Sequence, residues 1–232
     1  MIRRVAVIVP AANEEQHIGP CLTAIIAARS HLYRAVANVS VQIFVVLDSC
    51  HDGTPQIAAA FGGLRSITIT ARSVGAARRA GASAALDGGD HASEVWLATT
   101  DADSQVPPDW LTRMVAEAQR GAHLVLGTVL PGADLGPATR AEWLSRHHLR
   151  DGHPHVHGAN FGIRGDAYLA LGGWRPLVTG EDVDLARRAA LAGQLRITRT
   201  AGIPVVTSVR RVGKAPRGFS SYLRALGAPA VL

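Results

Sequence analysis

Cysteine, aromatic residues and long apolar runs are all scarce in this chain of 232 residues, and each scarcity excludes a class of protein. The two cysteines, Cys21 and Cys50, give neither a disulfide framework nor a zinc-binding spacing, so each is expected to be a small buried hydrophobe. Aromatic residues make up 5% of the chain, which argues against a nucleic-acid-binding protein with stacking residues. No apolar run reaches the roughly 18 to 20 residues that span a bilayer.

The start of the chain, residues 1–10, is basic and then apolar, which superficially suggests a signal peptide. The apolar run is too short, and Asn13-Glu14-Glu15 follows it where small residues and a cleavage site would be required. We therefore expect a first strand here and a cytoplasmic protein.

Lysine is almost absent as well, and no acidic residue follows Asp184. The net charge is +6, and basic residues then continue along the chain at Arg187, Arg188, Arg196, Arg199, Arg210, Arg211, Lys214, Arg217 and Arg224. Arginine favours bidentate contact with phosphate. This basic C-terminal segment is expected to be a solvated surface, or to contact a diphosphate, an anionic acceptor or, peripherally, a membrane surface.

Apolar, β-branched runs alternate with alanine-rich helical stretches along the first part of the chain. Strands are predicted at residues 5–10, 41–48, 64–70, 94–100 and 122–128. Helices are predicted at residues 14–30, 54–61, 74–86 and 108–120. Continuous apolar strands separated by helices predict an α/β fold with a mixed, mostly parallel sheet that is flanked by helices on both faces.

The pattern changes after Pro131, where Pro131-Gly132 and Gly136-Pro137 interrupt the chain. Further helices are predicted at residues 138–149, from 166 onward and at 182–192, and strands at 160–164, 195–199 and 203–208. Since no obvious linker separates the two parts, we expect a single domain over residues 1–232 whose halves, 1–130 and 131–232, share one sheet.

Acidic residues stand at the ends of three predicted strands. Glu14 follows the first, Asp48 ends the second, and Asp101 and Asp103 follow the fourth. Ligands of open α/β sheets bind outside the carboxyl ends of the strands. Carboxylates gathered at one edge repel each other, so these are expected to bind a cation or groups rich in hydrogen-bond donors.

Asp101-Ala102-Asp103 is the strongest candidate for a metal site. Alternate side chains of an extended backbone share a face, so both carboxylates can address one ion. Hard oxygen ligands suit Mg²⁺ or Mn²⁺, which would neutralise a leaving diphosphate. Asp-X-Asp is common in loops and helix caps, and only its place after a buried strand favours the metal.

The other strand ends have structural interpretations beside the functional one. Asn13 could cap the following helix, with Glu14 and Glu15 near its positive end. Asp52-Gly53-Thr54 is typical of a turn and a helix start.

Six segments, in order over about residues 4–195, resemble those of family 2 glycosyltransferases, which have the GT-A fold. They are residues 9–15 (VPAANEE), 46–54 (VLDSCHDGT), 71–78 (ARSVGAAR), 100–103 (TDAD), 158–164 (GANFGIR) and 180–185 (GEDVDL). The resemblance implies a Rossmann-like GT-A sheet, a nucleotide-sugar-binding half over residues 1–130 and an acceptor-binding half over 131–232. It also implies a hexosyltransferase-type activity that moves a sugar from a nucleoside-diphosphate sugar to an acceptor hydroxyl.

The resemblance further implies a role for each matching position. The nucleotide sugar would contact Pro10, Ala12, Glu14, Asp48, Arg78 or its neighbour Arg79, Asp101 and Ala102. Asp103 would bind the divalent cation, Mg²⁺ or Mn²⁺. The acceptor side would be formed by His157, Gly158, Ala159 and Asn160.

The resemblance places the catalytic base at Asp182, with Glu181 as the second choice. The base would deprotonate the acceptor hydroxyl in an inverting displacement, although retaining enzymes share this fold. Gly180-Glu181-Asp182 could instead be a charge pair at a helix N-terminus.

The chain departs from the family pattern in its histidines. Many GT-A enzymes bring a late histidine to the metal, whereas no histidine follows His157 here. Five histidines gather before the acceptor loop, at His147, His148, His153, His155 and His157. Their spacing matches no common structural zinc site, so a polar acceptor loop is the preferred interpretation.

Two other functions fit parts of the sequence. A sugar-phosphate nucleotidyltransferase also uses a strand-end acid and a metal, but it usually carries a glycine-rich basic loop where residues 11–15 are acidic. A non-catalytic basic protein would agree with the net charge, but no helix shows a dense basic face with stacking residues.

Overall fold

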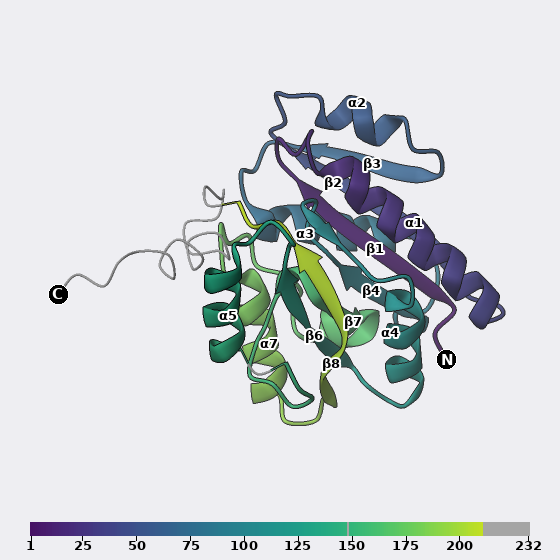
Figure 1. Cartoon of the computed structure of the whole chain (residues 1–232). Coiled ribbons are helices and arrows are strands. Elements are labelled where there is room, and N and C mark those ends of the chain that lie inside the picture. The colour runs from purple at the N-terminus through teal and green to yellow at the C-terminus, as the bar shows by residue number, and fades with distance from the viewer. Residues whose placement is uncertain (148, 211–232) are drawn as a thin grey trace.

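The protein, described from a computed structural model over residues 1–147 and 149–210, is built on one mixed sheet (Figure 1). Its eight strands follow the order β3-β2-β1-β4-β7-β6-β8-β5. They are β1 (Arg4–Ala11), β2 (Ser40–Asp48), β3 (Leu64–Ile69), β4 (Val95–Thr99), β5 (Ser104–Gln105), β6 (Leu124–Pro131), β7 (Phe161–Arg164) and β8 (Ile197–Thr207). Strands from before and after Pro131 therefore belong to the same sheet.

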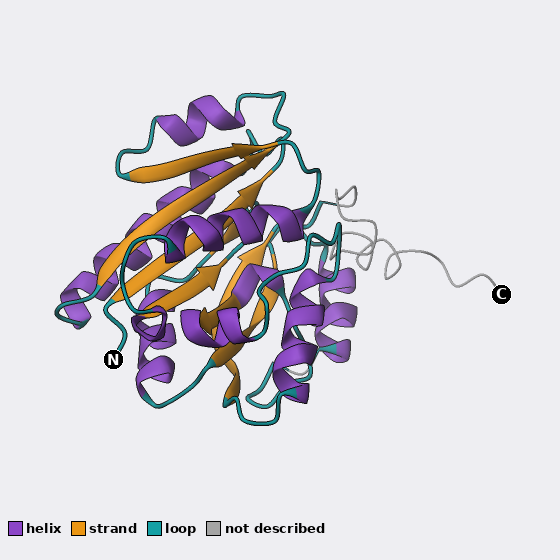
Figure 2. Cartoon of the chain, turned by 180° about the vertical axis from the view of Figure 1, so that it is seen from behind, coloured by secondary structure: helices purple, strands orange, loops and turns teal. Residues whose placement is uncertain are grey.

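Helices cover both faces of the sheet, as Figures 1 and 2 show from opposite sides. They are α1 (Ile18–Ala35), α2 (Thr54–Ala59), α3 (Val74–Leu86), α4 (Trp110–Gln119), α5 (Pro137–Arg146), α6 (Gly165–Ala170) and α7 (Glu181–Leu191), with 3-10 turns η1 (Ala92–Glu94) and η2 (Gly158–Asn160). Within the described residues, no helix has the length and the apolar character needed to cross a membrane.

The alternation of β1 explains the two hydrophobic layers. Val5, Val7 and Val9 pack in one cluster with residues of α1 and α4, and Ala6 and Ile8 pack in the other with residues of α3 and α7. All five side chains are fully buried. A strand buried on both faces is apolar throughout, which is why the sequence shows a continuous run here.

The directions of the strands gather their carboxyl ends at one edge. β1 pairs in parallel with β2 and β4, and β2 pairs in parallel with β3. β7 is antiparallel to both β4 and β6, while β6 and β8 are parallel. The loops that follow β1, β2 and β4 therefore meet at the same edge, as the sequence predicted.

Several predicted boundaries differ from those in the structure. The first helix begins at Ile18 with His17 as its N-cap, because Asn13 has a left-handed φ of 55° and bonds elsewhere. The fourth strand ends at Thr99. The two last predicted strands form the single strand β8, which stays paired with β6 on both sides of an irregularity between Gly127 and Val129.

Candidate active site

Two loops at the carboxyl edge are joined by side-chain bonds. The amide of His51 donates to Asn13 Oδ1 at 2.7 Å, and the amide of Gly53 donates to Glu15 Oε2 at 2.9 Å. Asn13 thus holds the loop after β2 and does not cap α1, which corrects the sequence interpretation of this cluster. The loops after β1 and β2 form one fixed rim.

Asp48, at the end of β2, is bound on both carboxylate oxygens. The amides of Arg72 and Ser73 each donate to it at 2.8 Å. Ser73 in turn accepts from Ala76 and caps α3, the helix that was predicted with the correct bounds. Asp48 therefore fixes the turn into α3, and only its remaining lone pairs are available to a nucleoside.

Arg78 links the Asp-Ala-Asp turn to α7. Its guanidinium is 2% exposed, pairs with Asp101 Oδ1 at 2.5 Å and makes a second ion pair with the buried carboxylate of Glu181. Gly158 packs directly on it, since a Cβ at that position would lie 2.3 Å from Arg78 Nη2. Arg79 is exposed. Of the two arginines, Arg78 is therefore the one that orients Asp101, a residue predicted to contact the nucleotide sugar.

Asp103 is paired with an arginine that follows β8. Nη2 of Arg210 lies 2.9 Å from Asp103 Oδ2, and Nη1 of Arg210 donates to both oxygens of Glu14 at 2.8 Å. Burial, together with the neighbouring charge of Asp101, raises the pKa of the Asp103 carboxyl to about 6. The sequence shows a basic C-terminal segment, but no local pattern distinguishes Arg210 from its basic neighbours.

Asp182, at the start of α7, points toward Gly158 in the predicted acceptor loop. Its Oδ2 accepts a hydrogen bond from the amide of Gly158 at 2.6 Å, and its Oδ1 accepts from the amide of Val183 at 2.8 Å. Unlike the adjacent Glu181, Asp182 is only partly buried. A basic oxygen that solvent can reach therefore lies beside the turn η2.

Asn160 anchors the predicted acceptor loop through its buried side chain. Its Nδ2 donates to the carbonyls of Thr128 and Ile203 at 2.8 and 2.6 Å, and its Oδ1 accepts from Trp110 Nε1 at 2.9 Å. The side chain is fully buried, and Gly127 makes room for it. With these three bonds to the protein, Asn160 holds the loop in place rather than presenting its amide at the surface.

The histidines before η2 form a stack. His147 lies on the buried Trp143 ring with centroids 3.9 Å apart, and His155 lies 5.0 Å from His147 and 5.9 Å from His157. Burial and the neighbouring histidines lower the pKa of His157 to about 3, so its ring is neutral. His148 lies outside the described residues.

Neither the histidine stack nor the Asp-Ala-Asp turn is a preformed metal cage. In the part of the chain that the structure describes, no three histidine, cysteine, aspartate or glutamate side chains are grouped to hold a metal ion. At the edge of the sheet, any ion on Asp103 would need most of its ligands from a bound molecule or from water.

A cavity of about 240 Å³ opens beside Arg210 at the carboxyl edge. It is lined by Asn13, Glu14, Glu15, Gln16, His17, Asp52 and Arg210. The predicted residues Pro10 and Ala12 are partly buried next to it in the chain, whereas Ala102 and Ala159 are buried. Residues that line the cavity therefore belong to, or directly follow, the segments that predicted a nucleotide-sugar site.

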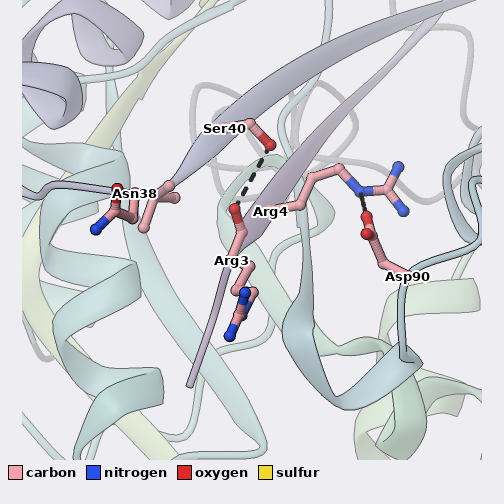
Figure 3. A pocket seen from close by; sticks show the side chains of 6 residues that line it. Arg3, Arg4, Asn38, Ser40 and Asp90 are labelled. Atoms are coloured by element: carbon pink, nitrogen blue, oxygen red, sulfur yellow. Dashed lines mark hydrogen bonds and ion pairs between the residues drawn. The ribbon is translucent and has the colours of Figure 1, made fainter.

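A larger cavity, of about 400 Å³, lies at the opposite end of β1 and β2 (Figure 3). Arg3 immediately precedes β1 and Arg4 is its first residue, and Figure 3 shows their side chains pointing apart. Arg4 Nε lies 2.6 Å from Asp90 Oδ2, so its charge is already paired. None of the site residues predicted from the sequence lines this cavity.

Several solved structures resemble the chain in fold. S. aureus TarS 1–349 in complex with UDP is 15% identical, with a TM-score of 0.64 over 89% of this chain and 61% of that one. Mannosyltransferase PcManGT from Pyrobaculum calidifontis, in complex with GDP-Man and Mn²⁺, is 22% identical, with a TM-score of 0.66 over 97% of this chain and 61% of that one. Glucosyl-3-phosphoglycerate synthase from Mycobacterium tuberculosis, in complex with Mg²⁺ and UDP, is 18% identical, with a TM-score of 0.58 over 97% and 78%.

These similarities confirm the predicted GT-A fold. The chain spans 61% of the length of the first two structures. No curated protein matches it. The sequence model of glycosyl transferase family 2 matches residues 6–167, which is more than half of the chain, and the chain therefore belongs to this family.

Proposed function

We propose that this chain transfers a sugar from a nucleoside-diphosphate sugar to an acceptor hydroxyl. The observation that carries the proposal is the meeting of Asp101 and Asp103 with the Glu14 loop at the carboxyl edge, beside a cavity of about 240 Å³. The structural neighbours include complexes with UDP and with GDP-Man and Mn²⁺, which supports a donor of this class.

The charges of the site favour a divalent cation in the donor complex. Among the described residues, the guanidinium groups of Arg78 and Arg210 pair with the carboxylates of Glu14, Asp101, Asp103 and Glu181, and Asp182 adds a fifth carboxylate. A negative site repels a negative diphosphate unless further positive charge enters with it. Mg²⁺ or Mn²⁺ suits carboxylate oxygens and would neutralise the charge that develops on the leaving diphosphate.

Asp103 is the residue that would hold this cation. Its side chain is 10% exposed, and its Oδ2 lies 2.9 Å from Arg210, which lines the cavity. Asp101 is held by Arg78 and remains partly exposed, so it can meet the ribose or the diphosphate. The donor itself would complete the coordination of the ion.

Asp182 is the residue proposed to deprotonate the acceptor hydroxyl, with inversion at the anomeric carbon. Its carboxylate is partly exposed and is oriented by the amide of Gly158. Glu181 is 2% exposed and paired with Arg78, so it acts as a positioning residue. The acceptor would lie over His157, Gly158 and Ala159, on a loop that Asn160 anchors.

Thermal-shift titration with UDP and GDP, each with and without Mn²⁺, tests the proposal. A ligand that binds the folded state raises its apparent stability by mass action. We expect one nucleotide to raise the melting temperature, and the rise to depend on Mn²⁺ and on Asp103. If neither nucleotide binds under any condition, or if Asp103→Ala binds as well as the wild type, the assignment of this site is wrong.

A further inference from the structure

We propose that Arg210 is a built-in cation that occupies the side of Asp103 needed by the metal and must leave when the metal and donor bind together. The inference rests on the proposed function. It adds a prediction about binding order: the free protein disfavours the metal alone and accepts it with the nucleotide.

Arg210 takes the place of a cation between two carboxylates. Its two terminal nitrogens bridge Glu14, at the end of β1, and Asp103, beyond the end of β4. The side chains of Glu14 and Asp103 are only 6% and 10% exposed, and that of Arg210 is 27% exposed. Two nearly buried carboxylates that face each other repel, and the guanidinium between them relieves this repulsion.

A divalent ion on Oδ2 of Asp103 cannot share this arrangement with Arg210. An ion bound to a carboxylate lies about 2 Å from the ligating oxygen. Nη2 of Arg210 is 2.9 Å from Asp103 Oδ2, so an ion on that oxygen would lie within roughly 5 Å of the guanidinium. Like charges at this distance in a partly buried site repel strongly, so one of them must move.

The backbone next to Arg210 allows such a movement without breaking the sheet. β8 ends at Thr207, and two hydrogen bonds of the described residues 208–210 are relevant here. The amide of Ser208 donates to the carbonyl of Asp103 at 3.1 Å, and the amide of Arg210 donates to the hydroxyl of Ser208 at 3.3 Å. The side chain of Arg210 can therefore rotate away while Ser208 stays on the Asp103 turn.

The direct test is Mn²⁺ binding to the nucleotide-free protein, measured from the free Mn²⁺ signal in electron paramagnetic resonance. Arg210→Gln is expected to bind Mn²⁺ about tenfold more tightly than the wild type, because the competitor is gone. Arg113→Gln is the matched control: it removes the same charge from an exposed pair with Asp109 and should leave Mn²⁺ affinity unchanged.

Arg210→Lys separates competition from general electrostatics. It keeps the positive charge but cannot bridge Glu14 and Asp103 with two nitrogens. We expect its Mn²⁺ affinity to lie between those of the wild type and Arg210→Gln. If Arg210→Lys binds Mn²⁺ as weakly as the wild type, the positive charge alone explains the effect, and the bridging role of Arg210 is wrong.

Repeating the titrations with saturating UDP or GDP separates this inference from the proposed function. Competition predicts that the nucleotide strengthens Mn²⁺ binding more in the wild type than in Arg210→Gln. If Mn²⁺ binding is unchanged or weaker in Arg210→Gln while the nucleotide still strengthens it in both proteins, the inference fails and the proposed function stands. If neither protein binds Mn²⁺ even with nucleotide, both are overturned.

Discussion

The carboxylate of Asp182 accepts a hydrogen bond of 2.6 Å from the backbone amide of Gly158. This bond joins the start of α7 to the turn η2, so the proposed base and the proposed acceptor loop are positioned by each other. The carboxylate stays partly exposed, so its remaining lone pairs can meet an acceptor hydroxyl. The relationship makes it possible to separate the chemical role of Asp182 from its structural one.

Asp182→Asn should abolish most transfer while leaving the loop intact. The amide oxygen of asparagine can still accept from Gly158, but it cannot take the proton of the acceptor. General-base catalysis contributes about 10²- to 10⁴-fold, so the rate constant of transfer should fall by about 10³-fold. The rate is measured in single-turnover reactions, and nucleotide affinity by thermal shift should change by less than about threefold.

Asp182→Ala serves as the comparison, because it loses the Gly158 bond as well. If Asp182→Asn transfers sugar at the rate of the wild type, Asp182 is not the base. If Asp182→Asn and Asp182→Ala both lose nucleotide binding, the residue acts through the loop instead.

Glu181→Gln should lower the free energy of unfolding, and its effect should not be limited to the rate of transfer. The change leaves the buried guanidinium of Arg78 with Asp101 as its remaining charged partner. Breaking a buried ion pair on one side costs about 3 kcal/mol, and the free energy of unfolding is measured by urea denaturation. Glu117→Gln, which breaks a surface pair with Arg120, should change it by less than about 0.5 kcal/mol. Equal effects of the two changes would contradict the structural role of Glu181.

The neutral ring of His157 predicts a loss of stability in acid. Its pKa is about 3 in the folded protein, below the ordinary value of 6.5, because burial and neighbouring histidines disfavour the charged form. As the pH falls below 6.5, the unfolded chain takes up a proton that the folded chain refuses, so the free energy of unfolding decreases. At pH 5 the loss from this group is about 2 kcal/mol, and it continues until the pH approaches 3.

Urea denaturation at pH 7.5 and pH 5 measures this effect. His157→Gln should lose about 2 kcal/mol less than the wild type between the two values. His91→Gln, at an exposed histidine, should follow the wild type. Parallel behaviour of all three proteins would show that His157 titrates in the folded state as it does in the unfolded chain.

The sequence predicted local features of this site better than its long-range pairs. Helix α3 was predicted with the correct bounds, because Ser73 is a strong N-cap and the alanine-rich run after it favours a helix. β8 was divided in two because Gly202 interrupts the β-branched pattern, although pairing with β6 continues beyond it. The pairs of Arg210 with Glu14 and Asp103 leave no local pattern, since each partner is more than 100 residues from Arg210 in the sequence.

Gly158→Ala tests whether the proposed acceptor loop at Gly158 and the turn at Asp101 move together. A Cβ at Gly158 would lie 2.3 Å from Arg78 Nη2, so the guanidinium would have to move away from Asp101 or the loop away from Asp182. Crowding of this kind costs about 1 to 3 kcal/mol of stability. Nucleotide affinity and transfer should fall together, measured by thermal shift and single turnover. Gly62→Ala, where no atom lies within 4 Å of the added Cβ, should leave both unchanged. A loss of transfer in Gly158→Ala with unchanged nucleotide affinity would mean that the loop moves alone and Arg78 keeps its hold on Asp101.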